Sequence, residues 1–546
     1  MGTWYLKPIR GSAPVVRLGR QKVSIGRHPD NAVPLTDDLA SRFHCEIEPG
    51  SEGFLLKDLN SKNGTKVNEV RVKEASLKAG DVVRVGHHEF LLEVDEDDAD
   101  RSALSDSAVE PSPLGNSHDR DLPWASALTD LINNLPPKQS RLEEPAIIDS
   151  MGKPSQALSG TSDGPGAVRL LLLAAAKARA TDLHIEPKQS QTFNVRLRVD
   201  GQMVAIAELP ERVGELVFGL VKSACNMRVA GRDAVLEGHF SAIFGERRVE
   251  YRVSLTPSVH GQKLVLRVLD TLAAPSSLSE MGMAQYMADR VRRTCDQDHG
   301  LLLTCGPTGS GKTTTLYNAL REIDREARNV VTIEDPVEYQ LDNITQIPID
   351  EHKGNTFGGL LRSVLRQDPD VILVGEIRDE ETARTAMQAA MTGHLVFSTV
   401  HAKDTIAAVF RLLDLKVEPY LVANSLDLVL AQRLVRLLCD HCKRAVPVPP
   451  GVATRLGRFL QGKNEMYVAT GCARCLRTGF RGRRAIFELL EFNDDLRDVV
   501  LKSPTIADMK RIIEQGLFTT LAQFGWRLVS EGITTLDEVD RVAGQG

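Results

Sequence analysis

A glycine-rich segment that follows an apolar run offers the chemistry to bind a polyphosphate. Residues 301–305 are apolar, and the residues after them fit the pattern GxxxxGK[ST]. Glycines let successive backbone N–H groups turn toward phosphate oxygens, Lys312 can reach the β- and γ-phosphates, and Thr313 can ligate Mg²⁺. Apolar residues at helical spacing after the loop predict a strand–loop–helix unit. The predicted nucleotide-binding residues are Gly306, Pro307, Thr308, Gly309, Ser310, Gly311, Lys312, Thr313 and Thr314.

Two further apolar runs end in carboxylates. Residues 371–374 lead to Glu376, and residues 330–333 lead to Glu334 and Glu338. Each run reads as a buried parallel strand that delivers an acid at its C-terminal edge. Glu376 is predicted to orient the water that attacks a γ-phosphoryl group, or to hold hydrated Mg²⁺. One such strand could end in surface acids by chance, but two beside a phosphate loop favour function.

Two histidines flank a third apolar run, residues 395–400. His394 precedes this run and His401 follows it. Either imidazole could hydrogen-bond a γ-phosphate, although a lone histidine beside a strand is more often structural. The strand context leads us to predict a catalytic role for His394, and it leaves His401 open between the two interpretations.

From about Val168 to its C-terminus, the chain resembles the type II secretion and type IV pilus assembly ATPases, the GspE/PilB-like family. The resemblance rests on several motifs in one order, at residues 180–187, 195–201, 306–314, 334–339, 361–370 and 394–401. It implies a RecA-like ATPase core preceded by a smaller α/β domain. It also implies a homohexamer that uses ATP and Mg²⁺.

The same resemblance implies that arginines of the smaller domain reach the phosphates. On this basis Arg196 and Arg198 are predicted to be catalytic, and Arg252 and Arg267 stand in matching strands. The alternative is that these charges lie on solvated strand faces. The chain departs from the family pattern at residues 236–239 and at Gln262, which leaves the detail of the arginine set open.

Four of the eight cysteines form two CxxC pairs, Cys439 with Cys442 and Cys472 with Cys475. Two such knuckles are suited to closing one tetrahedral Zn²⁺ site, whereas a cytoplasmic disulfide would be reduced. Free buried thiols are the alternative. Because a four-cysteine insert is typical of the family that the chain resembles, we predict a zinc site.

The first 95 residues form a separate pattern. Short alternating apolar runs between Gly, Asp and Asn turns indicate a β-sandwich. Their order and spacing resemble a forkhead-associated (FHA) domain, a reader of phosphothreonine, and Gly26, His44 and Gly64 match its loop-supporting positions. An FHA fold used as a phosphate-independent docking platform is the alternative. The resemblance implies a phosphothreonine pocket made by Arg27, Ser41, Arg42, Lys62 and Asn63.

Composition agrees with several folded domains and argues against a broadly basic nucleic-acid binder. The 546 residues are 42% hydrophobic and carry a net charge of −6. We expect no nucleic-acid partner. The N-terminus leads straight into the sandwich pattern, and the longest apolar run is far too short to span a bilayer. We therefore expect a cytoplasmic protein whose membrane contact comes only through partners.

Between the sandwich and the smaller domain the composition changes to Asp, Ser, Pro and Gly, which predicts a flexible linker. Apolar residues within 124–135 fall on one helical face, so a partner-docking helix and a helix folded back onto the core are both open. The predicted domains are FHA at 1–95, linker at 96–165, small α/β domain at 166–272, and RecA-like ATPase at 273–546 with a zinc insert at 439–475.

These features together predict a cytoplasmic hexameric ATPase that powers pseudopilus or pilus assembly. We expect it to be peripheral at the inner membrane through platform proteins, and to bind a phosphothreonine-containing protein through its FHA domain. One alternative is an FHA-based signalling adaptor with a degenerate motor, which the complete phosphate loop and carboxylates disfavour. A retraction motor or a DNA translocase is another; the four-cysteine insert disfavours the first and the acidic balance the second.

Overall fold

The chain divides into two compact units, residues 1–113 and 114–546, which are described separately. The computed structural model describes residues 3–10, 16–18, 22–28, 31–35, 37, 39–50, 53–68, 70–95, 123–136, 144–155, 158, 160, 162–189, 191–227, 234–270, 274–502, 504–516 and 518–544. Among these residues, the helices are all too short or too polar to cross a bilayer.

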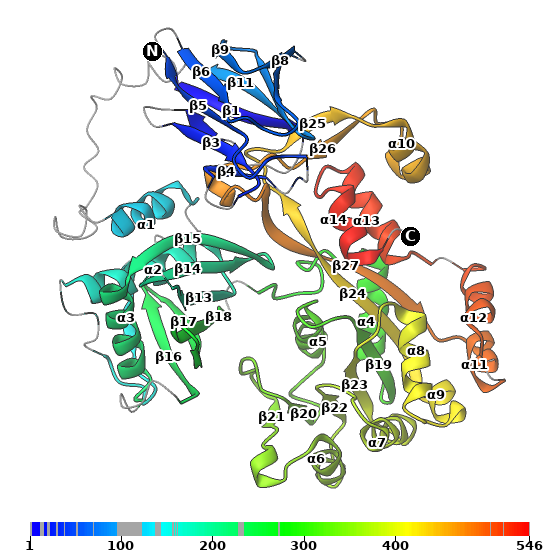
Figure 1. Ribbon diagram of the computed structural model, residues 1–546. Coiled ribbons are helices and arrows are strands. Elements are labelled where there is room, and N and C mark those ends of the chain that lie inside the picture. Colours follow the sequence, from blue (N-terminus) through cyan, green and yellow to red (C-terminus); the bar gives the residue numbers. More distant parts are fainter. Residues whose placement is uncertain are drawn as a thin grey trace, which may run out of the picture. The chain divides into compact units, whose positions relative to one another are not determined.

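The first unit is a sandwich of two sheets (Figure 1). The strand orders are β2-β1-β11-β10-β7-β8 and β4-β3-β5-β6-β9. Alternation along β10 buries Val83 and Val85 against the opposite sheet, as a half-buried strand requires. The strands are β1 (Thr3–Arg10), β2 (Val16–Leu18), β3 (Val23–Gly26), β4 (Val33–Pro34), β5 (Cys45–Gly50), β6 (Gly53–Asp58), β7 (Thr65–Val67), β8 (Val70–Val72), β9 (Glu74–Leu77), β10 (Val82–Val85) and β11 (His88–Asp95).

The second unit begins with a small α/β domain. Its antiparallel sheet has the order β12-β16-β17-β18-β13-β14-β15, and its helices share one apolar core with the buried face of that sheet. Alternating burial along β17 leaves the other face polar. The elements are α1 (Pro123–Asn134), β12 (Ala146–Ile148), α2 (Asp163–Ala178), β13 (Asp182–Pro187), β14 (Thr192–Val199), β15 (Gln202–Pro210), α3 (Glu211–Ala224), β16 (Leu236–Phe244), β17 (Arg247–Ser258) and β18 (Gly261–Leu269).

Helix α1 corrects part of the predicted linker. Trp124, Leu128, Ile132 and Leu135 are all buried in the core of the small domain, and Lys177 Nζ donates to the Ile132 carbonyl oxygen at 3.2 Å. Strand β12 likewise joins the sheet by pairing with β16. Within residues 96–165, therefore, these two segments belong to the small domain. Of the two interpretations of residues 124–135, the structure supports a helix folded back onto the core.

The ATPase domain is built on a second sheet, with the order β21-β20-β22-β23-β19-β24-β27. All neighbours are parallel except β24 and β27. Every residue of β19, β20, β22 and β23 is buried, as strands covered on both faces must be. The strands are β19 (Gly300–Cys305), β20 (Val330–Glu334), β21 (Thr345–Pro348), β22 (Val371–Val374), β23 (Leu395–Val400), β24 (Leu426–Leu438) and β27 (Phe480–Glu491).

Helices pack against this sheet. A smaller group of elements lies between β24 and β27 in the sequence. A two-stranded sheet, β25 (Arg444–Pro447) with β26 (Glu465–Val468), lies within the cysteine insert, whose second pair surrounds the 3₁₀ turn η5 (Ala473–Cys475). The helices are α4 (Gln285–Cys295), α5 (Lys312–Arg321), α6 (Phe357–Val364), α7 (Glu380–Met391), α8 (Thr405–Asp414), α9 (Pro419–Ser425), α10 (Pro450–Leu456), α11 (Asp494–Leu501), α12 (Ile506–Ile513), α13 (Leu521–Ser530) and α14 (Leu536–Ala543).

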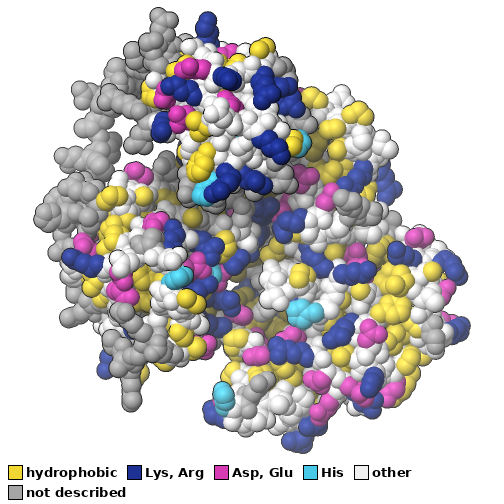
Figure 2. Space-filling view, viewed as in Figure 1, with side chains coloured by type: hydrophobic (Ala, Val, Ile, Leu, Met, Phe, Trp, Pro, Cys, Tyr) yellow, Lys and Arg dark blue, Asp and Glu magenta, His cyan; other side chains and the backbone are white. Residues whose placement is uncertain are grey.

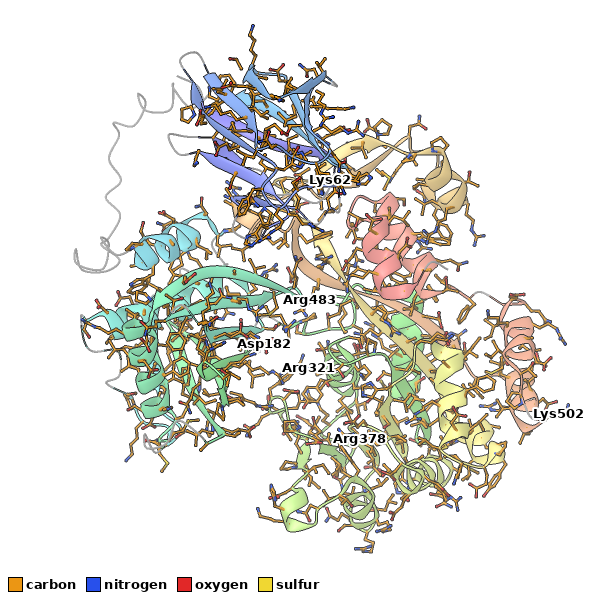
Figure 3. The ribbon with its side chains drawn as sticks, viewed as in Figure 1. Lys62, Asp182, Arg321, Arg378, Arg483 and Lys502 are labelled. Carbon is orange, nitrogen blue, oxygen red and sulfur yellow. The ribbon has the colours of Figure 1, made fainter. Side chains whose placement is uncertain are left out.

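The small domain contacts the ATPase domain through the turn between β14 and β15. The Gly482 backbone N–H donates to Asp200 Oδ2 at 2.7 Å, and Arg483, labelled in Figure 3, lies 3.6 Å from the same carboxylate. Arg436 Nη1 donates to Gln202 Oε1 at 2.7 Å. Both acceptors stand in or beside the Val-Asp-Gly motif of the sequence, so this motif joins the two domains.

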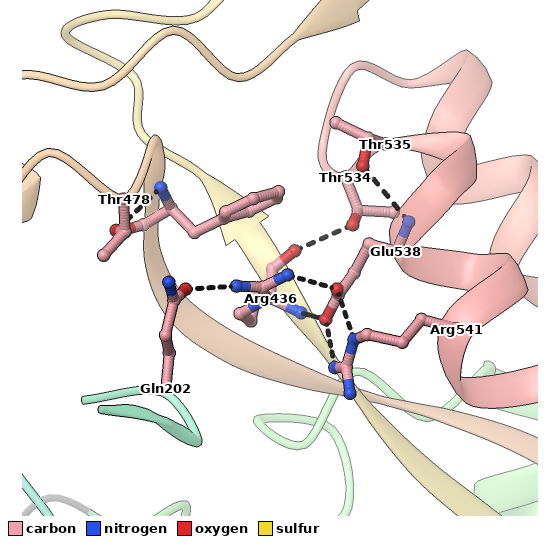
Figure 4. A network of polar contacts seen from close by, with 8 residues as sticks. Gln202, Arg436, Thr478, Thr534, Thr535, Glu538 and Arg541 are labelled. Atoms are coloured by element: carbon pink, nitrogen blue, oxygen red, sulfur yellow. Dashed lines mark hydrogen bonds and ion pairs between the residues drawn. The ribbon is translucent and has the colours of Figure 1, made fainter. Parts of the chain in front are cut away.

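Arg436 also belongs to a buried ionic network around Glu538 (Figure 4). The Glu538 carboxylate accepts from Arg436 at 2.7 Å and from Arg541 at 2.7 and 2.9 Å, and it also accepts from the Arg436 backbone N–H. Burial alone would raise the pKa of Glu538, but these donors outweigh burial and lower it to about 2. The network ties α14 to β24 and, through Arg436, to the small domain.

Replacing Glu538 by Gln should lower the free energy of unfolding of the second unit. A carboxylate whose pKa falls from 4.5 to about 2 on folding contributes about 3 kcal/mol at pH 7. This contribution is present above pH 4.5 and is lost as the pH falls toward 2. Urea denaturation at both ends of this range measures it. The Asp537→Asn variant, changed at an exposed position of the same helix, should match the unaltered protein; an equal loss in both variants would contradict the assignment.

Candidate functional site

Four functional side chains meet because the strands that carry them are parallel. The phosphate loop follows β19, Glu334 ends β20, Glu376 follows β22 and His401 follows β23. Parallel strands present their C-terminal ends at one edge of a sheet. At this edge lies a cavity of about 760 Å³, lined by Glu334, Glu376, His401 and Lys312 among others. Residues 268–270 of the small domain line the same cavity.

The phosphate loop is held by a side chain that sequence reasoning missed. Gln432 of β24 donates through Nε2 to the Ser310 carbonyl oxygen at 2.8 Å and accepts from Thr315 Oγ1 at 2.5 Å. Gly311 takes φ = +88°, a conformation that favours glycine, at the N-terminus of α5. The signal that could have found Gln432 is the polar pair Gln432-Arg433, buried inside the apolar run of residues 428–435.

Lys312 lies at the start of α5, inside the curve of the loop. Its Nζ donates to the carbonyl oxygens of Gly306 at 2.9 Å and Pro307 at 3.2 Å. Burial lowers the pKa of Lys312, and the nearby Glu376 carboxylate partly opposes that effect. The ammonium group is thus positioned, at the N-terminus of a helix, where phosphate oxygens are stabilised.

Glu376 is carried on a short loop fixed by two strands. The Gly375 backbone N–H donates to the Ile333 carbonyl oxygen at 2.8 Å, and Thr399 Oγ1 donates to the Gly375 carbonyl oxygen at 2.9 Å. The Glu376 carboxylate forms an ion pair with Arg378, labelled in Figure 3, and lies 3.5 Å from His401 Nε2. Its side chain is 18% exposed. A carboxylate so placed can accept a proton from water or orient it.

The other two predicted acids lie in different surroundings. Glu334 is buried and accepts from Thr332 Oγ1 at 2.6 Å, from Gln346 Nε2 at 3.1 Å and from the Tyr317 hydroxyl. Its orientation is therefore fixed by three donors. Glu338 lines the cavity from an exposed position on the loop after β20.

The structure separates His394 from this cavity. His394 precedes β23, at the opposite edge of the sheet, and its Nδ1 lies 3.1 Å from the Ala389 carbonyl oxygen. His401, at the other end of the same strand, reaches the cavity. The structure therefore places His401, and not the predicted His394, at the cavity, because six extended residues lie between the two histidines.

The predicted arginines occupy the polar face of the small domain's sheet. Arg196 pairs with Glu186 at 2.5 Å, and Arg198 lies 3.4 Å from Asp182, which is labelled in Figure 3. Neither lines the cavity of its own chain. Arg252 contacts the ATPase domain: its Nη2 donates to the carbonyl oxygen of Val337, directly before Glu338, at 3.1 Å.

A second cavity, of about 670 Å³, continues from the first. Both are lined by Gly311 and Thr314 of the phosphate loop and by Val268 and Asp270 of the small domain. The second one extends along Arg483 and neighbouring residues of β27. A ligand with phosphates at the loop therefore has space for a further group on the side of the small domain.

The four predicted zinc ligands converge on one point. All four Sγ atoms lie within 4.8 Å of one another, and the separation is 4.0 Å for Cys439–Cys472, 3.9 Å for Cys442–Cys475 and 3.7 Å for Cys472–Cys475. Four sulfurs placed tetrahedrally about 2.3 Å from Zn²⁺ would lie about 3.8 Å apart. The backbone N–H groups of Cys472 and Gly479 donate to Cys475 Sγ, as a thiolate would require. The thiols therefore fit a tetrahedral metal.

In the first unit, three loops bring the predicted phosphothreonine residues together. The Arg27 backbone N–H donates to the Ser41 carbonyl oxygen at 2.9 Å, and the Lys62 backbone N–H donates to Ser41 Oγ at 2.9 Å. Asn63 Nδ2 donates to the Leu39 carbonyl oxygen at 2.7 Å. Arg27, Lys62 and the nearby Arg42 expose their side chains, and Figure 2 shows Lys and Arg gathered at this end of the unit.

Buried polar side chains hold these loops. Asp58 accepts from the hydroxyls of Ser61 and Thr65, both at 2.6 Å, and these bonds outweigh burial and lower the pKa of Asp58. Burial lowers the pKa of His44, whose Nδ1 accepts from the Ser41 backbone N–H at 3.0 Å. At Gly26 a Cβ atom would meet the Arg42 carbonyl oxygen at 2.6 Å, so the loop requires glycine there.

Comparison with known proteins identifies both units of the chain. A family described as "Type II/IV secretion system protein" matches residues 166–541, and an FHA domain matches residues 23–86. Type II secretion system protein E of Pseudomonas aeruginosa is 38% identical over 403 residues, 73% of this chain and 80% of that protein. Type IV pilus assembly ATPase PilB of Myxococcus xanthus is 37% identical over 411 residues, 73% of this chain and 70% of that protein.

A solved structure extends the comparison to the fold. The ATPase DotB of Legionella pneumophila superposes with a TM-score of 0.54 at 20% identity, over 70% of this chain and 96% of DotB. This likeness confirms the predicted fold class of the second unit, and the matched families confirm the suspected resemblance. The chain therefore belongs to the type II/IV secretion system family of ATPases, and it carries an FHA domain ahead of the ATPase.

Proposed function

We propose that the chain is a motor subunit that hydrolyses Mg-ATP to drive assembly of a pseudopilus or a pilus. The observation that carries this proposal is the cavity at the parallel sheet edge, where Lys312, Glu376 and His401 meet residues 268–270 of the small domain. Because one cavity is lined by two domains, a change in its contents alters how the domains fit together. The printed functions of the relatives, type II secretion and type IV pilus assembly, support the choice of machine.

Each residue of the cavity has its own role in phosphoryl transfer. Lys312 and the loop N–H groups hold the γ-phosphoryl group, and the Thr313 hydroxyl is placed to ligate Mg²⁺. Glu376 orients the attacking water, with its own position fixed by Arg378 and the strand contacts of Gly375. His401, rather than His394, is the histidine placed to hydrogen-bond the phosphate. ATP supplies the phosphoryl group, and the second cavity provides space for its nucleoside.

A homohexamer is the proposed active form, with Arg196 and Arg198 completing the site of a neighbouring copy. Their pairing with carboxylates of β13 keeps both guanidinium groups on the polar face of the sheet, where a second copy could receive them. We place the hexamer in the cytoplasm, at the inner membrane through platform proteins. The complete set of phosphate-loop and acidic residues favours this motor over an adaptor with a degenerate site.

For the first unit we propose recognition of a phosphothreonine-containing protein. Arg27, Arg42 and Lys62 offer three cationic side chains around Ser41 and Asn63, on loops that hydrogen bonds hold together. Charge-assisted hydrogen bonds of this kind are worth roughly 1.5–3 kcal/mol each. Together these hydrogen bonds are strong enough for the unit to bind a phosphorylated threonine in preference to an unmodified one.

For the four cysteines we propose a structural Zn²⁺ ion. The sulfur separations match a tetrahedral site, and four thiolates leave no position open for catalysis. When bound, the ion would form four Zn–S bonds, and these bonds would stabilise the insert in place of a larger apolar core. The cysteines themselves fix the chain between the end of β24 and the start of β27.

The catalytic assignment is tested by two matched pairs of variants. Glu376→Gln should hydrolyse ATP at least ~100-fold more slowly while still binding it, whereas Lys312→Ala should also weaken binding. His401→Ala should lower turnover by roughly 10-fold or more, and His394→Ala should leave it nearly unchanged. Steady-state phosphate release and nucleotide titration measure these effects. An unaltered protein that binds ATP without turnover would favour the adaptor instead.

Zinc binding is tested by elemental analysis. The purified chain should contain one zinc, and Cys472→Ser should lose it and lower the stability of the second unit while the first unit stays folded. Cys225→Ser, a single buried thiol far from the cluster in sequence, is the control and should retain the metal. A folded protein that contains no metal would refute the site.

Phosphothreonine recognition is tested with peptides. The first unit should prefer a phosphothreonine peptide to its unmodified twin by about 2–3 kcal/mol, a factor of roughly 30 to 150, and Arg27→Ala should remove most of that preference. Fluorescence anisotropy of a peptide library measures the preference. Lys78→Ala is the control, because β9 ends beside the start of β6, at the far end of the sandwich. If both twins bind equally, the unit is a constitutive docking platform.

A further inference from the structure

An apolar residue beside the cysteine cluster, Leu476, touches the small domain. Leu476 follows the fourth cysteine directly and packs against the apolar core of the small domain. Among the described residues, it is the one apolar side chain of the ATPase domain that packs against that core. The 3₁₀ turn η5, which ends at Cys475, lies beside α1. The second cysteine pair therefore stands at a contact between domains.

The backbone that presents Leu476 is strained. Leu476 and Arg477 take φ values of +52° and +60°, a left-handed conformation that costs a residue with a side chain about 1–2 kcal/mol. Backbone hydrogen bonds partly offset this strain: the Leu476 N–H donates to the Ala473 carbonyl oxygen and the Arg477 N–H to that of Cys472. The turn is also anchored through its two cysteines. Its conformation therefore depends on whatever keeps four thiols within 4.8 Å.

Helix α1 depends on packing against its neighbours for its stability. It is 12 residues long, and an isolated helix of that length is marginal in water. Its buried side chains face α2 and β15, and Lys177 reaches only its last turn. The Leu476 side chain and η5 add a contact from the ATPase domain. Losing this contact would leave α1 held by the small domain alone.

We propose that metal binding at the four cysteines fastens α1, and with it the small domain, to the ATPase domain through Leu476. The ion holds η5 in its strained turn, the turn presents Leu476 to the small-domain core, and α1 packs beside it. The cluster is thus a metal-dependent clasp between domains. This inference rests on the proposed zinc site, and its experiment separates the failure of one from the failure of the other.

The test compares amide hydrogen exchange of peptides that cover residues 123–136, in the full-length chain. Three samples are needed: the zinc-loaded protein, the same protein after chelation, and Leu476→Ala. Chelation and Leu476→Ala should each speed exchange in α1 by roughly 5- to 30-fold, the factor expected when one partly buried contact is lost. Leu476→Ala should keep its zinc. Returning zinc should restore slow exchange to the chelated protein and should not rescue Leu476→Ala.

The controls separate a failure of the proposed clasp from a failure of the proposed zinc site. Arg474→Ala changes an exposed residue of the same turn and should exchange like the unaltered chain. Exchange in β10 and β11 of the first unit should be the same in every sample. If chelation leaves α1 protected, or if Leu476→Ala keeps zinc and leaves α1 protected, the clasp is wrong while the zinc site stands. If the purified protein holds no metal, both fall.

Discussion

The functional site depends on the parallel pairing of four fully buried strands. Since β20, β22, β23 and β19 run in the same direction side by side, each one delivers its last residue, or the loop that follows it, to the same edge. A reversed strand would send its acid or its histidine to the other side of the domain. The same apolar side chains that allow these strands to be buried on both faces therefore also bring the functional residues together.

The small domain is attached to this framework at a few separate points. The turn at Asp200 meets Gly482, Gln202 meets Arg436, and Arg252 meets the loop before Glu338. Each contact is polar, and each involves one or two hydrogen bonds. Contacts of this size are exchanged more readily than a packed apolar interface. The nucleotide cavity lies between domains whose attachment is suited to adjustment during a reaction cycle.

The sequence was sufficient where a pattern has a local cause. The phosphate loop, the acid-ended strands, the four-cysteine cluster and the sandwich loops are each marked by short motifs in the sequence, and the structure brings the residues of each set together. The sequence was insufficient where the position of a residue depends on partners far away in the chain. His394 and His401 flank the same strand, and only the sheet's direction tells them apart. Only the structure, which places β24 beside the phosphate loop, shows that Gln432 supports that loop.

The same limit explains α1 and the arginines. The amphipathic pattern at 124–135 predicts a helix, but the surface that covers it is supplied by α2 and β15 much later in the chain. Arg196 and Arg198 lie on the polar face of a sheet and outside the cavity of their own chain, which the sequence pattern around them does not reveal. Strand β24 has one further consequence: it runs from Gln432, which contacts the phosphate loop, to the residue before Cys439, and it pairs with β27 along most of that length, with a shift in register between Arg436 and Leu438. Seven residues of strand span about 23 Å. The phosphate loop and the cysteine cluster are therefore connected through one stretch of strand, although they lie far apart in the sequence.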